Sequence, residues 1–299
     1  MIQEIPITTL NNEPIKVKKP NIPQSDNKDL PRFFFNMLLV AQKHSGKTFL
    51  LAKLIKNYQK TKIKDNEGNI HKIRIILFAP TAYSESNKIY ETLNVDPDDI
   101  HLNYSDDLLL NVLDEIKQEN EDIKEYKKKL ELLEKFKNTK DINDLTEEEL
   151  LTLHMFKFSK QHLEKPKHEH ERINFLIFDD IIGTNNGAFR KSGSALQNLI
   201  IKNRHHNTNV ILTTQYIKSI NPIIRENIDI WCLYKSQNKK ALIEKIYELV
   251  SGVVSEQHFI ELFEHATEKP YSAFVIDNHK ETPKENKFKI NWNTILRIN

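Results

Sequence analysis

The chain has 299 residues, of which 38% are hydrophobic and 29% are charged, so it can bury a core beneath a very polar surface. Its formal net charge of +2 excludes nucleic-acid binding through bulk charge alone, and any contact with DNA must be local. The single cysteine, Cys232, excludes an internal disulfide, and no apolar run is long enough to span a bilayer.

The first 31 residues are expected to form an extended N-terminal arm, because five prolines interrupt a polar segment. The opening residues lack the basic start and the apolar stretch of a signal peptide. Together with the single cysteine, this predicts a soluble, intracellular protein.

A phosphate-binding loop follows the arm. Residues 33–40 form an apolar run typical of a buried strand, and residues 48–58 have helical periodicity. Between them, residues 41–48 match the pattern G-x-x-x-x-G-K-[ST], except that Ala41 replaces the first glycine. The alternative, a chance match before a surface helix, does not account for both flanks. Strand, loop and helix in this order therefore indicate a nucleotide site.

The backbone N–H groups of such a loop surround the β-phosphate, and the helix N-terminus adds partial positive charge. Lys47 is expected to bridge the β- and γ-phosphates of ATP, and the Thr48 hydroxyl is expected to hold Mg²⁺. Ala41 is compatible with the loop if its φ is negative. The residues expected to bind the nucleotide are Ala41, Gln42, Lys43, His44, Ser45, Gly46, Lys47, Thr48 and Phe49.

Residues 84–170 are expected to form a helical insertion. Apolar residues recur there every seven positions, which is typical of a short coiled-coil seam. These residues are Leu109, Ile116, Ile123 and Leu130. A capping box at residues 146–149 then predicts the start of a second helix. The sequence leaves open whether the two helices project as a hairpin or lie on the domain surface.

Strands alternate with helices in the rest of the chain. The later strands are expected at residues 173–178, 209–214, 228–234 and 272–277. This alternation predicts an α/β fold with a doubly wound, mostly parallel sheet, whose core comprises residues 32–83 and 171–299. Ligands in such sheets bind at the carboxyl ends of the strands.

Two aspartates end the expected strand at residues 173–178. One carboxylate at this place can hold Mg²⁺ through its water shell, and its neighbour can accept a proton from the attacking water. We assign Asp179 to the metal and Asp180 to the water, although the sequence alone would also allow the reverse.

Gln215 ends the next expected strand, where its amide can hydrogen-bond the attacking water and the γ-phosphate. Thr213 and Thr214 could also serve as this polar sensor. Arg190, Arg204 and Arg225 lie near these motifs, and one of them is expected to reach the γ-phosphate of a neighbouring subunit.

A GTPase switch is the main alternative, because residues 180–183 also fit the pattern D-x-x-G. However, the chain has no N-K-x-D or T-K-x-D motif for reading guanine. The acidic pair also follows the loop by more than a hundred residues, with an additional strand between them. Both observations favour an ATPase with an inserted strand and a polar sensor.

Three segments together resemble the FtsK/HerA superfamily of P-loop ATPases, which has a RecA-like core with a sensor strand. They are the loop at residues 41–48, the acidic strand at residues 175–180, and the segment at residues 203–215. Within this superfamily, the chain looks most like the poxvirus-type genome-packaging ATPases of large DNA viruses and virophages. Arg204 matches an arginine that precedes the sensor strand in FtsK-like proteins.

The resemblance implies a homo-oligomeric ring that hydrolyses ATP with Mg²⁺ and moves double-stranded DNA into a capsid. It implies Lys47, Asp180, Gln215 and Arg204 as catalytic residues, with Arg204 acting on the neighbouring subunit. The resemblance also implies a capsid or nuclease partner. It further implies that the protein is located in the host-cell cytoplasm or in the virion. Another DNA translocase of this fold, a nucleotide-dependent switch and a small-molecule kinase are the alternatives.

Overall fold

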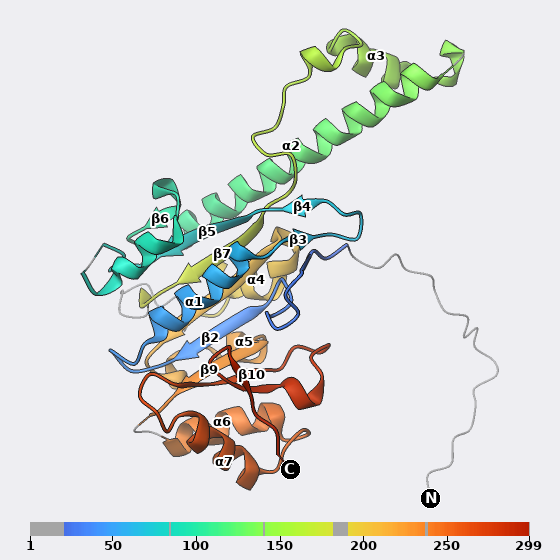
Figure 1. The fold of residues 1–299 in the computed structure, drawn as a ribbon. Helices are drawn as coiled ribbons and strands as arrows, with labels where there is room; N and C mark the ends of the chain where they lie inside the picture. The colour runs from blue at the N-terminus through green and yellow to red at the C-terminus, as the bar shows by residue number, and fades with distance from the viewer. Residues whose placement is uncertain (1–20, 84, 140, 182–190, 237–238, 299) are drawn as a thin grey trace, which may run out of the picture.

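The computed structural model describes residues 21–83, 85–139, 141–181, 191–236 and 239–298 (Figure 1). Within these residues, a sheet of nine strands runs in the order β12-β11-β10-β9-β2-β8-β7-β5-β6. No helix in these ranges is long and apolar enough to cross a membrane. The strands are β2 Asn36–Val40, β5 Ile73–Phe78, β6 Ile100–His101, β7 Ile173–Phe178, β8 Thr208–Thr214, β9 Ile230–Tyr234, β10 Ala273–Asp277, β11 Phe288–Ile290 and β12 Thr294–Ile295.

The six strands from β9 to β6 are parallel, and helices cover both faces of the sheet. The strands are buried on both faces, which explains why they read as continuous apolar runs in the sequence. Helix α1 packs on one face, whereas the base of α2 and the helices α4 to α7 pack on the other. The predicted doubly wound, mostly parallel α/β fold is therefore confirmed. The helices are α1 Lys47–Lys60, α2 Asp106–Asn138, α3 Glu147–Met155, α4 Ala195–Lys202, α5 Pro222–Glu226, α6 Lys239–Val250 and α7 Glu256–Ala266.

The C-terminal edge of the sheet is antiparallel. Strand β10 pairs antiparallel with β9, and β11 and β12 extend the same edge. The start of β10 therefore lies at the carboxyl edge of the parallel strands, because Ala273 is the partner of Tyr234. A small separate sheet joins β1 Gln24–Ser25, β3 Ile63–Lys64 and β4 Ile70–His71, so the end of the N-terminal segment is tied to the core.

A long helical arm projects from the core (Figure 1). Helix α2 has 33 residues and is therefore roughly 50 Å long. Its first turns pack into the main core through residues such as Leu109 and Ile116. At its far end, Leu133 packs with Leu153 of α3 in a separate small cluster. The capping box of Thr146 and Glu149 that opens α3 is present as expected.

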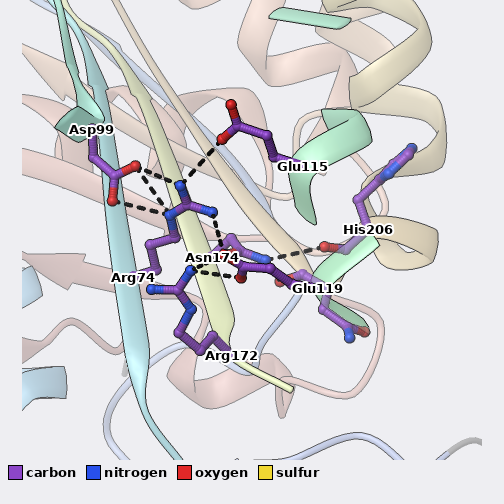
Figure 2. Close-up of polar contacts among 8 residues, drawn as sticks. Arg74, Asp99, Glu115, Glu119, Arg172, Asn174 and His206 are labelled. Carbon is purple, nitrogen blue, oxygen red and sulfur yellow. Dashed lines mark hydrogen bonds and ion pairs between the residues drawn. The ribbon is translucent and has the colours of Figure 1, made fainter. Parts of the chain in front are cut away.

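Charged side chains fix the base of this arm to the sheet (Figure 2). Arg74 of β5 donates hydrogen bonds of 2.7–3.1 Å to Asp99 and lies 3.6 Å from both Glu115 and Glu119 of α2. Arg172, just before β7, donates two hydrogen bonds of 2.6 and 2.8 Å to Glu119. Arg74 in β5 and Arg172 just before β7 thus hold two glutamates on one face of α2, which sets the direction in which the arm leaves the core.

Candidate nucleotide-binding site

The phosphate-binding loop lies between β2 and α1 at the carboxyl edge of the sheet. His44 has a φ of 60° and Gly46 a φ of 89°, so two left-handed residues turn the loop around. The Ser45 hydroxyl donates a 2.6 Å hydrogen bond to the Gln42 carbonyl and closes it. Such a turn followed by a helix N-terminus presents backbone N–H groups to an anion. The local geometry therefore suits phosphate.

The backbone conformation at position 41 does not require a glycine. Ala41 is buried, does not adopt a positive φ, and donates its N–H to the Thr214 carbonyl at 2.9 Å. This bond joins the start of the loop to the end of β8. Strand β8 lies between β2 and the acidic strand β7, so the inserted strand expected from the sequence separates the loop from the two aspartates.

The loop lysine reaches the acidic pair across β8. The Lys47 ammonium contacts the Asp180 carboxylate and lies 3.9 Å from Oδ1 of Asp179. Lys47 and Asp179 are only 7% and 1% exposed, whereas a third of the Asp180 side chain is exposed. Asp180 has a φ of 53°, which an aspartate tolerates better than most residues. A fixed positive charge therefore faces two carboxylates at the mouth of the loop.

Both carboxylate oxygens of Asp179 accept short hydrogen bonds. The Thr213 hydroxyl donates to Oδ1 and the Tyr90 hydroxyl donates to Oδ2, each at 2.6 Å. Burial and the charge of Asp179 raise the pKa of Tyr90 well above its ordinary value, so the phenol stays protonated at neutral pH and remains a donor. The Tyr90 hydroxyl also interacts with the Thr48 side chain. It therefore links the two residues expected to bind the metal.

The oxygen donors of Thr48 and Asp179 fit Mg²⁺, which prefers hydroxyl, carboxylate and water ligands. Because Tyr90 and Thr213 already bond both oxygens of Asp179, this carboxylate suits a contact through metal-bound water. Tyr90 is then an outer partner that orients both donors.

We expect Tyr90→Phe to weaken Mg²⁺ binding about tenfold, because Asp179 and Thr48 lose their common partner. Titration of the ADP-bound protein with Mn²⁺, followed by electron paramagnetic resonance, measures this effect without turnover. ADP affinity without metal should not change. Tyr104→Phe is the matched control, since Tyr104 also donates to an aspartate, Asp106, at 2.7 Å. Equal metal affinities in both variants and in the wild type would contradict the role of Tyr90.

The expected sensor Gln215 directly follows the last residue of β8 and is half-buried. The bond from Ala41 to Thr214 brings this end of β8 to the loop, so Gln215 lies at the same edge as Lys47. Thr213, which the sequence offered as an alternative sensor, instead contacts the acidic pair.

Arg204, the arginine expected to act on a neighbouring subunit, lies far from the phosphate loop of its own chain. Arg204 is exposed and precedes β8, whose seven residues span roughly 23 Å, so it lies at the opposite edge of the sheet from Gln215. It therefore cannot reach the phosphate loop of its own chain. Arg225 is half-buried in α5 and donates to the Ile217 carbonyl at 3.5 Å. Arg190 lies outside the described residues.

Sequence reasoning missed Tyr90. The residue lies in an irregular helical segment at residues 85–93, and no local pattern distinguishes it from the other tyrosines of the chain. Only the fold brings this segment beside α1 and Asp179.

The chain has the fold of a P-loop NTPase. No protein-family model and no curated protein sequence matches the chain. Among solved structures, it is similar to the genome-packaging NTPase B204 of Sulfolobus turreted icosahedral virus 2 in complex with ATP-gammaS. The TM-score is 0.40 at 17% identity, over 86% of this chain and 96% of that one.

Two further similar structures come from bacteria. One is the N-terminal domain of zonular occludens toxin from Neisseria meningitidis, with a TM-score of 0.32 at 15% identity over 69% of this chain and 78% of that one. The other is the cytoplasmic domain of the type VII secretion ATPase EccC from Thermomonospora curvata, with a TM-score of 0.38 at 13% identity over 88% and 24%. The predicted structural similarity to genome-packaging ATPases is confirmed, and at these identities it concerns the fold.

Proposed function

We propose that this protein hydrolyses ATP to move double-stranded DNA into a viral capsid, as a homo-oligomeric ring. The observation that carries the hydrolytic part is the position of Lys47 between the phosphate loop and the acidic pair. A site that only bound phosphate would not need a second carboxylate beside the first. The viral DNA motor is supported by the motifs that resemble genome-packaging ATPases.

Each residue has a distinct task in this proposal. Lys47 offsets the charge of the β- and γ-phosphates, for which it exchanges its contact with Asp180. Asp180 is then free to accept a proton from the attacking water, and Gln215 orients that water. Mg²⁺, held from Thr48 and Asp179, neutralises phosphate charge when bound.

The charges expected to contact DNA fall into two groups. Lys202, Arg204 and His205 are exposed near the amino edge of the parallel strands. Lys239 and Lys240 open α6, which follows the carboxyl end of β9, and they pair with Glu264 and Glu244. The first group has more freedom to contact phosphates, because the described residues give it no salt bridge.

ATP hydrolysis stimulated by double-stranded DNA tests this function. We expect binding to phosphates and not to base edges, so affinity should fall steeply between about 50 and 200 mM salt and vary little with sequence. Hydrolysis without any response to DNA would contradict the motor. Phosphate transfer to an acceptor other than water would instead indicate a kinase, and a preference for guanine nucleotides would indicate a switch.

The position of Arg204 leads to a prediction about the ring. If Arg204 reaches the γ-phosphate in the neighbouring subunit, Arg204→Ala and Lys47→Ala subunits should each be inactive alone. Mixed rings should recover part of the activity, because an intact loop in an Arg204→Ala subunit can face an intact Arg204 of a Lys47→Ala neighbour. Phosphate release over a series of mixing ratios measures this recovery.

Lys202→Ala is the control, because it also removes a positive charge at the amino edge of the sheet. Lys202→Ala subunits should hydrolyse ATP on their own, without being mixed with another variant. No recovery in rings shown to be mixed would move the role from Arg204 to Arg190 or Arg225. Full hydrolysis by a monomer in the presence of ATP and DNA would contradict the ring.

A further inference from the structure

Two large aromatic side chains beside the phosphate loop are exposed. Phe49, in the first turn of α1, is 65% exposed, and Tyr271, just before β10, is 71% exposed. Tyr271 lies against the loop, since a Cβ built on Gly46 would be 3.3 Å from its Cδ1 and 3.4 Å from its Cβ. Tyr271 also has a φ of 62°, which is costly for a bulky residue and needs support from its surroundings.

The two rings lie near the same turn of the chain. Phe49 is three residues after Gly46, so both positions share one face of the start of α1. Side chains of a helix tilt toward its N-terminus, so the Phe49 side chain is directed back toward the loop that Tyr271 contacts at Gly46.

The positions of the strands determine the direction in which a bound nucleotide extends. The acidic pair follows β7, which lies beyond β8 on one side of β2. The γ-phosphate must point to this side, because Lys47 contacts the acids there. Strands β9 and β10 lie on the other side of β2, and the start of β10 is at the carboxyl edge. The nucleoside therefore leaves the loop toward Tyr271.

We propose that Tyr271 and Phe49 form the site for the nucleobase, which stacks on their rings. The inference rests on the proposed nucleotide binding and adds the residues that hold the base. The exposed rings supply flat apolar faces, and every base has a complementary π-face. A purine should bind more tightly than a pyrimidine because it covers more of each ring.

The test compares ATP with inorganic tripolyphosphate, which has the three phosphates but no base. Calorimetric titrations with Mg²⁺ should show that Tyr271→Ala weakens ATP binding about tenfold and leaves tripolyphosphate binding unchanged. Tyr271→Phe should retain wild-type ATP affinity, and Phe49→Ala should also weaken only ATP. Tyr83→Ala is the control, because the Tyr83 side chain is also 65% exposed. Tyr83 follows β5, which lies on the opposite side of β2 from β10.

The outcomes separate this inference from the proposed function. Equal weakening of ATP and tripolyphosphate by Tyr271→Ala would mean that the residue only shapes the loop around Gly46, which would overturn the inference. Unchanged ATP affinity in both alanine variants would overturn it as well, with nucleotide binding itself intact. A wild-type protein that binds neither ligand would contradict the proposed function and the base site together.

Discussion

Replacing Lys47 with alanine is expected to reduce ATP hydrolysis at least about 1000-fold. The Lys47 ammonium is the positive charge placed between the phosphate loop and the two aspartates, and it is 7% exposed. Without it, the negative charge that develops on the γ-phosphate loses the ammonium that offsets it, and the carboxylates of Asp179 and Asp180 repel the nucleotide. Steady-state phosphate release and ATP titration measure both losses.

Lys53→Ala is the matched control for this variant. Lys53 lies on the exposed face of the same helix, so the change in charge is equal but distant from the loop. We expect wild-type hydrolysis in Lys53→Ala. Retention of more than about one tenth of the activity in Lys47→Ala would contradict the role given to Lys47.

Replacing Asp180 with asparagine is expected to preserve ATP binding and to reduce hydrolysis by about 100- to 10,000-fold. The amide has nearly the same shape, and its oxygen can still accept a hydrogen bond from Lys47. It is a poor acceptor for the proton of the attacking water, so only the chemical step should fail. Single-turnover kinetics with saturating ATP separate this step from binding.

Asp179→Asn gives the comparison that distinguishes the two acids. The asparagine NH2 that replaces one carboxylate oxygen only donates, so either Tyr90 or Thr213 loses the oxygen that accepts its hydrogen bond. We therefore expect Asp179→Asn to lose the gain in ADP affinity that Mg²⁺ provides, and Asp180→Asn to keep it. The reverse result would show that the roles of the two aspartates are exchanged.

The sequence predicts the features that depend on neighbouring residues. The loop at residues 41–48 and the capping box at Thr146 both appear where expected, because each depends on contacts within a few residues. The strand at residues 272–277 was also predicted, but its antiparallel direction was not. An apolar run reports burial on both faces and contains no information about the direction of the neighbouring strand.

The candidate site also contains residues that local motifs predict and residues that only the complete fold brings there. Lys47 and Asp180 belong to motifs that each follow directly after a strand, so both could be placed at the carboxyl edge from the sequence. The contact of Tyr90 with Asp179 joins residues 89 positions apart, and Tyr271 meets Gly46 across more than two hundred residues. Such pairs depend on the complete sheet order. They could not be predicted from local patterns. In our proposals they supply the residues that orient the metal donors and hold the base.

The projecting arm has a mechanical consequence. Two arginines hold α2 near Glu115 and Glu119, and Lys124 still lies 3.5 Å from Glu171. About fourteen residues of the helix extend beyond Lys124. This length is roughly 20 Å, so a rotation of about 5 degrees at the base displaces the far end by about 2 Å. The cluster around Leu133 and Leu153 makes the far end a single packed unit. The arm is therefore a lever, and it amplifies any small change in angle between β5, β7 and α2 into a displacement at its tip.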